Sequence, residues 1–400
     1  MGHAKEALLE REERGWTADD KFVCAKCVED DHLKKLVRKN ATHNGCDYCG
    51  RKAKACAAPL EIVVEAVYET LTYFFADPAG AGVPRDDGEW LFEAKSTQEA
   101  LDDIGLEGHV DLVNDVVGAI SNDAWVAAAG GHWASSHEHE VLADSWSNFV
   151  EVVKHQSRFF FQVATKGSTS GPQEIEPGHF LQAVESILKS CRLLKHVPPR
   201  TSLFRVRERH VGDDWKPNQE TMGAPPTERA RAGRMNPPGI SYFYAALDRA
   251  TAISEVVRGP PSMLAVAGFR TRRQVNVIDL TDLPVRPSIF DSGKRDLRES
   301  VLFLEGFVES ISRPVRKDGQ EHLDYVPSQV VSEYFALAMK HLKGKAIDGL
   351  IYPSAVRQSG KNLVLFPTDR SPNVEFDQVD FVDAEELELG DWKALSAAVS

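Results

Sequence analysis

The stretch Gly-Arg-Met-Asn-Pro-Pro-Gly-Ile-Ser-Tyr-Phe-Tyr, residues 233–244, is the clearest indication of the fold. A turn rich in proline and glycine runs directly into a short aromatic strand, and an arginine lies at the rim of the turn. A guanidinium in this position can bind an anionic group, while an aromatic ring stacks on a flat ligand. We therefore expect Arg234 and Tyr244 to lie at a ligand-binding site.

The sequence on both sides of this stretch alternates between strand and helix patterns. Strand-forming residues gather in short runs: Ser202–Val206, Ile240–Tyr244, Met263–Phe269, Val275–Leu280, Leu350–Tyr352 and Leu363–Phe366. Helical spacing of apolar residues predicts helices between them: Ala246–Val257, Leu297–Ser312 and Ser328–Leu342. Pro198 and Pro199 break the preceding helix. We therefore expect an α+β domain over residues 199–400, with a long insertion at 212–239.

The cysteines predict a metal site near the N-terminus. Four of the six form two CxxC pairs with eighteen residues between the pairs: Cys24, Cys27, Cys46 and Cys49. Each pair can place two thiolates on one tight turn, and two such turns complete a tetrahedral site. Four protein ligands leave no open position, so we expect a structural zinc ion. His32 and His43 are alternative ligands, and Cys56 is interpreted as a spare thiol.

The residues between the cysteine pairs and the two prolines favour helices. Apolar residues recur at three- and four-residue spacing in these stretches: 60–74, 99–120, 141–161 and 180–196. We expect a zinc ribbon with an N-terminal helix over residues 1–57, and an all-helical regulatory or oligomerisation domain over residues 58–198. Three histidines are interpreted as loop residues, with a second metal site as the alternative: His132, His137 and His139.

The composition of the 400-residue chain excludes several classes of protein. The formal net charge is −13, so the chain lacks the broad basic surface that non-specific nucleic-acid binding needs. No apolar run approaches the roughly 18 residues of a membrane helix. Residues 1–20 are dense in charge and lack the apolar segment of a signal peptide. We therefore expect a cytoplasmic protein that binds neither nucleic acid nor membranes.

Two further segments carry polar residues suited to catalysis. Glu255 follows Tyr244 by eleven residues and lies on the helix predicted after the aromatic strand. Ser354 ends a predicted strand, and Asn362 begins the next one after a polar loop. Side chains at such strand edges can point into a cleft.

Taken in order, these motifs resemble those of the RES domain, a family named for an arginine, a glutamate and a serine and found mainly in bacterial toxin–antitoxin toxins. The family's Gly-Arg-Trp-Asn-x-x-Gly run corresponds to residues 233–239, with Met235 in place of the tryptophan. Its opening strand with an arginine corresponds to residues 203–206. Its tyrosine, glutamate, serine and downstream asparagine correspond to Tyr244, Glu255, Ser354 and Asn362. The resemblance covers residues 200–400.

The resemblance implies a bacterial toxin or defence effector that degrades NAD⁺ by cleaving the nicotinamide–ribose bond, on a fold related to ADP-ribosyltransferases. Such cleavage passes through an oxocarbenium-like state, which Glu255 can stabilise. Arg205 and Arg234 can pair with the pyrophosphate. Tyr244 can stack on nicotinamide or ribose, and Ser354 can orient the substrate. The resemblance adds further substrate-binding residues: Asn236, Tyr242 and Asn362.

Alternatives stay open at this point. Hydrolysis and phosphorolysis cleave the same bond, whereas ADP-ribosyl transfer to a protein and nucleotide binding without catalysis are different functions. Ser328 is the alternative to Ser354 as the functional serine. The run from Arg205 to His210 matches the Arg-x₄-His motif of HEPN ribonucleases, but it falls on a predicted strand and not on a helix. We expect a homo-oligomer, with an antitoxin or a trigger protein as a further partner.

Overall fold

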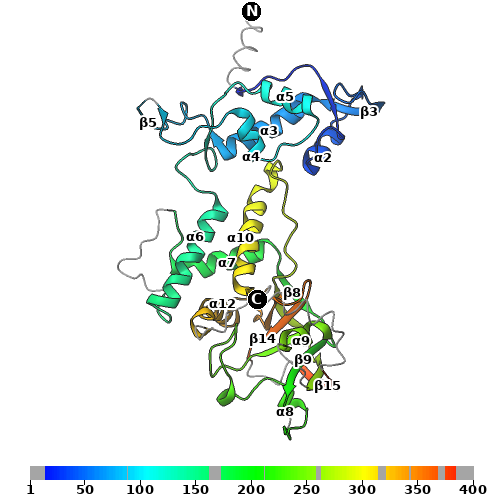
Figure 1. Cartoon of the computed structure of the whole chain (residues 1–400), viewed down its shortest axis with the longest axis vertical. Coiled ribbons are helices and arrows are strands. Elements are labelled where there is room, and N and C mark those ends of the chain that lie inside the picture. The colour runs from blue at the N-terminus through cyan, green and yellow to red at the C-terminus, as the bar shows by residue number, and fades with distance from the viewer. Residues whose placement is uncertain are drawn as a thin grey trace, which may run out of the picture. The chain divides into compact units, whose positions relative to one another are not determined.

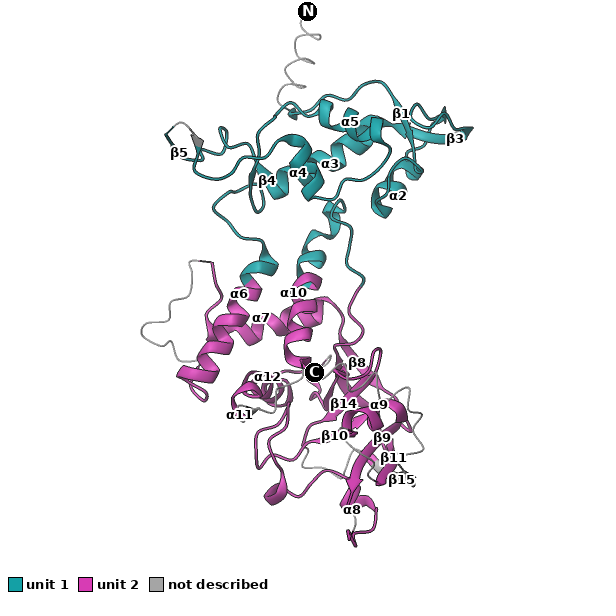
Figure 2. Cartoon of the chain, viewed as in Figure 1, with its two compact units in different colours: residues 1–141, 285–300 teal, residues 142–284, 301–400 magenta. Residues whose placement is uncertain are grey.

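The computed structural model describes residues 14–87, 89–161, 173–210, 212–257, 263–313, 321–341, 344–367 and 374–383. Its helices and strands carry the labels of Figure 1. Residues 1–141 with 285–300 form unit 1, and residues 142–284 with 301–400 form unit 2 (Figure 2). The helix predicted ahead of the cysteine pairs falls largely outside the described residues, and the three predicted domains stay a prediction.

A small sheet and two helices surround the cysteine pairs in unit 1. The antiparallel sheet has the order β1-β3-β2, with these bounds: β1 Phe22–Cys24, β2 His43–Gly45 and β3 Lys52–Pro59. Helix α2 spans Asp31–Lys39, and the Asp30 carboxylate caps it by accepting hydrogen bonds from two backbone N–H groups. Helix α3 spans Leu60–Phe74 and buries its predicted apolar stripe in the core of unit 1.

Short elements make up much of the rest of unit 1. They are α4 Thr97–Asp103, α5 Val110–Ala119, β4 Phe75–Ala76, β5 Arg85–Asp86, β6 Glu89–Trp90 and β7 Val126–Ala127. The region is helical as expected, but it is not all-helical, because β4 pairs with β7 and β5 with β6. Strands of two residues show no alternation that a sequence pattern could reveal, so tertiary pairing alone decides them.

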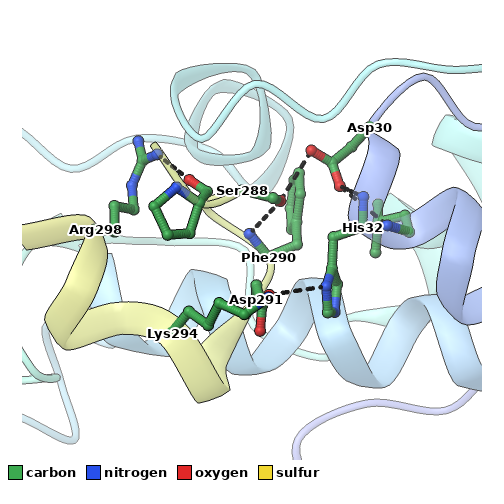
Figure 3. A network of polar contacts seen from close by, with 9 residues as sticks. Asp30, His32, Ser288, Phe290, Asp291, Lys294 and Arg298 are labelled. Carbon is green, nitrogen blue, oxygen red and sulfur yellow. Dashed lines mark hydrogen bonds and ion pairs between the residues drawn. The ribbon is translucent and has the colours of Figure 1, made fainter. Parts of the chain in front are cut away.

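A segment from the C-terminal half of the chain, residues 285–300, completes the core of unit 1. The Phe290 side chain is only 3 % exposed and belongs to the main buried apolar cluster of this unit. Two polar contacts flank it in Figure 3: Ser288 Oγ donates to Asp30 Oδ2 over 2.9 Å, and His32 Nδ1 lies 3.3 Å from Asp291 Oδ2. Helix α10, Arg295–Ser312, begins in the same segment.

Removal of the Phe290 ring is expected to destabilise unit 1 substantially. Phe290→Ala deletes a buried aromatic side chain and leaves a cavity, so the free energy of unfolding should fall by about 3–5 kcal/mol. Val285→Ala is the matched control, because Val285 lies in the same segment but is 92 % exposed. Denaturant unfolding measures both variants. An unchanged unfolding free energy in Phe290→Ala would contradict the placement of this segment in the core.

Unit 2 is built on an eight-stranded sheet with the order β15-β11-β9-β10-β14-β13-β12-β8. The strands are β8 Leu194–Val197, β9 Ser202–Arg209, β10 Phe243–Ala246, β11 Met263–Thr271, β12 Val275–Asp279, β13 Gly349–Pro353, β14 Lys361–Leu365 and β15 Val374–Asp383. Neighbouring strands are antiparallel except β12 and β13, which run parallel. Each strand predicted from 202 onward is present in this sheet, with ends shifted by a few residues.

Several helices precede the strands of this sheet or lie between them in the sequence. They are α6 Glu138–Glu151 with a π-helical end at Val152–Gln156, α7 Pro177–Ser190, α8 Gln219–Met222, α9 Arg249–Val256, α10, α11 Glu321–Asp324 and α12 Val326–Leu337. Helix α7 ends earlier than the predicted stretch 180–196, because β8 follows it and pairs with β12. Among the described residues, none of the helices is both long and apolar enough to cross a membrane.

The sheet opens between β9 and β10. Strand β9 pairs with β11 from Ser202 to Arg209, but it pairs with β10 only where Phe204 meets Ala246. Beyond that pair the two strands diverge. Helix α9 packs against β9 and β14 on the same part of the sheet (Figure 1). The fold therefore places a split in the sheet directly beside the helix that carries Glu255.

Candidate active site

A cavity of about 220 Å³ lies where β9 and β10 diverge. Five chemically distinctive side chains from β9, β10, α9, β13 and β14 line it: Arg205, Tyr244, Glu255, Tyr352 and Asn362. Four of these were predicted as site residues, and they come from parts of the sequence more than 150 residues apart. The fold thus brings a carboxylate, two phenols and the strand that carries Arg205 to one small cavity.

Glu255 is held in one orientation by two donors. Ser354 Oγ donates to Glu255 Oε1 over 2.7 Å, and Asn362 Nδ2 donates to the same oxygen over 2.6 Å. Helix α9 is itself fixed at its start, since Asp248 Oδ1 accepts a hydrogen bond of 2.8 Å from the backbone N of Thr251. The carboxylate is therefore positioned before any ligand binds, as a group that stabilises a developing charge must be.

A glycine lets the Ser354 loop approach α9. A Cβ at Gly360 would lie 2.7 Å from Thr251 Oγ1 and 3.0 Å from Ser354 Cβ, so a side chain there would push the loop away from the helix. The backbone N of Ser354 also donates to Gly360 O over 2.8 Å. The polar loop between β13 and β14 thus places Ser354 against Glu255 because a residue without a side chain stands opposite.

Tyr244 connects the cavity to the turn that precedes β10. Its hydroxyl donates to Asn236 Oδ1 over 2.7 Å and accepts from the backbone N of Met235 over 3.0 Å. Burial raises the pKa of Tyr244 well above its usual value, so the phenol is neutral near pH 7. Met235, in the place of the family's tryptophan, is itself buried at 1 % exposure.

Asn236 organises this turn. Its Nδ2 donates to the carbonyls of Arg231, Pro237 and Ile240 over 2.9–3.0 Å, and its side chain is almost completely buried. The amide is therefore occupied by the backbone of its own turn and does not line the cavity. Asn236 was expected to bind substrate, and its position instead suits a residue that gives Tyr244 its orientation.

The N-terminal part of α12 holds the same turn from the other side. Ser328 Oγ donates to Arg234 O over 2.6 Å, and Gln329 Nε2 donates to Gly233 O over 2.8 Å. Ser328 therefore contacts the turn, whereas Ser354 contacts Glu255. Of the two serines considered from the sequence, the structure brings Ser354 to the carboxylate.

The Arg234 side chain lies at the end of α10. Its Nη1 donates to Ile311 O over 3.2 Å and to Arg313 O. These carbonyls end a helix, where a cation is favourable. Arg234 is absent from the residues that line the cavity. Its guanidinium was expected to pair with a substrate phosphate, but in the structure it donates to backbone carbonyls at the end of α10.

Arg205 is the cation of the cavity. Its Nη1 is buried and has no hydrogen-bond partner among the described residues, and its guanidinium carbon lies 5.4 Å from the centre of the Phe243 ring. Burial, together with the neighbouring charge of Arg207, lowers the pKa of Arg205 to about 10. The group still stays charged at neutral pH, and a buried charge without a partner favours binding of an anion.

Of the tyrosines near the cavity, one that was predicted to bind substrate does not line it, and one that was not predicted does. Tyr242 was predicted to bind substrate, but it is 2 % exposed and packs on Phe366, with ring centres 5.3 Å apart. Tyr352 was not predicted, yet it lines the cavity. It is the direct register partner of Asn362 across β13 and β14, so both side chains point to one face of the sheet. The position of Tyr352 at the cavity follows from this pairing of two strands, and the pattern of residues within one strand cannot reveal it.

The four paired cysteines of unit 1 converge. Their Sγ atoms lie 3.8 Å apart for Cys24 and Cys27, 3.6 Å for Cys24 and Cys49, and 3.7 Å for Cys27 and Cys46. Four sulfurs at about 2.3 Å from a tetrahedral zinc ion would be separated by about 3.8 Å, so the cluster fits this metal. The backbone N–H of Arg51 lowers the pKa of Cys49 to about 7, which favours the thiolate that a metal needs.

The alternative ligands lie elsewhere. His43 stacks on Phe22 at 4.0 Å, and His139 Nδ1 lies 2.6 Å from Glu299 Oε2. Cys56 lies outside the group of converging thiols. Within the described ranges, the four-cysteine group is the one cluster with metal-ligand spacing. The histidines around residues 132–139 therefore form no second cluster of this kind there.

Comparison with protein families adds two matches. The model of the HEPN/RES N-terminal domain 1 matches residues 39–167, and the model of the RES domain matches residues 202–388. Neither the comparison with curated proteins nor that with solved structures found a match. The second match begins at β9 and includes every strand and helix that lines the cavity. Arg205 of the Arg-x₄-His run lies on strand β9, in agreement with the strand predicted for it.

Proposed function

Since the chain carries an RES domain at residues 202–388, preceded by a HEPN/RES N-terminal domain 1 at 39–167, we propose that it is an NAD⁺-degrading enzyme that cleaves the nicotinamide–ribose bond. The RES domain is associated with NAD-degrading toxins of toxin–antitoxin systems. The observation that carries the proposal is Glu255, held by Ser354 and Asn362 in a cavity that is also lined by Arg205, whose Nη1 has no hydrogen-bond partner among the described residues.

The proposed reaction breaks the bond between ribose C1′ and the nicotinamide nitrogen, and the bonding electrons leave with nicotinamide. Positive charge then develops on the ribose, as in other glycosidic cleavages. Glu255 stabilises this charge, since a preoriented carboxylate interacts more strongly with the transition state than with the substrate. Water or inorganic phosphate adds to C1′, and an added water molecule gives up one proton.

The other cavity residues bind and orient the substrate. Arg205 pairs with a phosphate of NAD⁺, because a guanidinium donates to two phosphate oxygens at once. The neutral rings of Tyr244 and Tyr352 flank the nicotinamide or ribose. Ser354 and Asn362 keep the Glu255 carboxylate directed at the ribose. The fold that supports this chemistry is, in the same proposal, related to that of ADP-ribosyltransferases.

Product analysis tests the proposal. The full chain is incubated with NAD⁺, with and without inorganic phosphate, and the products are separated by mass. Free ADP-ribose identifies a glycohydrolase, and ADP-ribose-1″-phosphate identifies a phosphorylase. ADP-ribosylated protein would identify a transferase instead. Intact NAD⁺ after long incubation would contradict the enzymatic proposal and favour a nucleotide-binding protein.

The N-terminal unit has a structural part in this proposal. The cluster of Cys24, Cys27, Cys46 and Cys49 would hold a zinc ion that stabilises its fold and takes no part in the chemistry. We further propose a cytoplasmic toxin or defence effector that forms a homo-oligomer. An antitoxin or a trigger protein would regulate it through the region before residue 199.

Loss of the Ser354 hydroxyl is expected to lower kcat for NAD⁺ by roughly tenfold to a hundredfold, because a hydrogen bond to a charged group contributes about 1.5–3 kcal/mol. KM should change little, since Ser354 acts on the carboxylate. Ser186→Ala is the control, because Ser186 lies exposed on α7 and donates to the carbonyl of its own helix. Steady-state kinetics of both variants decide the matter. A wild-type kcat in Ser354→Ala would exclude this role.

A further inference from the structure

A second guanidinium accompanies Arg205 on strand β9. Arg205 and Arg207 are two residues apart, so their side chains lie on the same face of the strand, about 6.6 Å from each other along it. Their register partners on β11 are Ala267 and Ala265. These small residues leave room for two long side chains side by side on one face.

Neither guanidinium has a hydrogen bond or an ion pair among the described residues. Burial lowers the pKa of both Arg205 and Arg207, and the charge of Arg207 lowers that of Arg205 further. Two partly buried like charges without a carboxylate destabilise the folded protein. Such an arrangement becomes favourable when an anion binds between the two cations.

The other arginines nearby are already occupied. Arg209 lies on the same face of β9, but its Nη2 donates to Asp213 O over 3.0 Å and to Trp215 O over 3.2 Å. Arg234 donates to the carbonyls that end α10. The contact with a substrate phosphate that the family resemblance suggested for Arg234 therefore has a better candidate on β9.

We propose that Arg207 is a substrate-positioning residue, which together with Arg205 binds the two linked phosphates of a dinucleotide. Arg205 lines the cavity at the split between β9 and β10 and holds one phosphate, and Arg207 holds the other one farther along β9. Two guanidinium groups in a row match two phosphates in a row. The identification of the ligand as NAD⁺ rests on the proposed function, whereas the pyrophosphate site does not.

Two measurements on the full chain test this site. Titration calorimetry measures binding of inorganic pyrophosphate, and steady-state kinetics measure kcat and KM for NAD⁺. Arg207→Gln should weaken pyrophosphate binding at least tenfold and raise the KM for NAD⁺ by a similar factor, with kcat within about twofold of wild type. Arg207→Lys keeps the charge and should recover part of the affinity. Arg209→Gln is the matched control and should leave both values unchanged.

The outcomes separate this inference from the proposed function. Weaker pyrophosphate binding in Arg207→Gln supports the site even if no variant degrades NAD⁺, and the proposed function alone would then fail. NAD⁺ degradation with wild-type KM and wild-type pyrophosphate affinity in Arg207→Gln would overturn the site and leave the function intact. An equal loss of pyrophosphate affinity in Arg207→Gln and Arg209→Gln would also overturn it, because the effect would then not follow the unpartnered guanidinium.

Discussion

Replacement of Glu255 by glutamine is expected to lower kcat for NAD⁺ by about a hundredfold or more, with little change in KM. The amide has nearly the same shape as the carboxylate, and its oxygen can still accept from Ser354 Oγ and Asn362 Nδ2. What disappears is the negative charge. Because the substrate ribose carries its full positive charge only near the transition state, the loss falls on kcat and spares binding.

The matched control for Glu255→Gln is a second substitution of a glutamate by glutamine. Glu228→Gln removes the same charge from an exposed position outside the cavity, and it should leave kcat unchanged. Thermal unfolding confirms that both variants are folded. If Glu255→Gln kept a kcat near that of wild type, the role of this carboxylate would be wrong, whatever products the enzyme forms.

Removal of zinc is expected to unfold the region around the four cysteines. Structural zinc contributes roughly 10 kcal/mol or more of apparent binding free energy, which exceeds the stability of most small domains. Cys24→Ser removes a fully buried ligand and should prevent ordered folding of the sheet formed by β1, β2 and β3. Elemental analysis of freshly purified protein and thermal unfolding with a chelator are the measurements.

Cys56→Ser is the matched control for this prediction. Cys56 lies on β3 of the same sheet, but its thiol lies outside the cluster of converging sulfurs. The zinc content and the unfolding temperature of the Cys56→Ser variant should therefore equal those of the wild-type protein. Less than about half an equivalent of zinc in fresh wild-type protein would contradict the site, and so would an unchanged unfolding temperature in Cys24→Ser.

Several features of the site could be predicted because they depend on short stretches of chain. Two CxxC turns bring four thiolates together once a strand pairs between them, and the four sulfurs lie within reach of one ion. Glu255 lies on the helix directly after β10, so its position follows from the eleven residues that separate it from Tyr244. The RES domain model matches residues 202–388, the part of the chain that contains the motif residues from Arg205 to Asn362.

Other features could not be predicted, because they depend on contacts between distant parts of the chain. Asn236 and Asn362 look equally suited to bind substrate in the sequence, but only Asn362 reaches Glu255. Residues 285–300 show nothing in their sequence that assigns them to unit 1, where Phe290 completes the core. Tyr352 faces the cavity through its pairing with β14, and a strand pattern gives no information on its partner.

The sequence by itself determined many elements of this protein: the strands β9 to β14, the helices α9, α10 and α12, the helix over 60–74, the cysteine pairs and the motif residues. Only the tertiary structure decided the split between β9 and β10, the use of Arg234 at the end of α10, and the unpartnered state of Arg205 and Arg207. The physical reason is the separation along the sequence over which each kind of interaction acts. Propensity and periodicity act over a few neighbouring residues, whereas register and charge pairing depend on which distant strand or helix packs alongside.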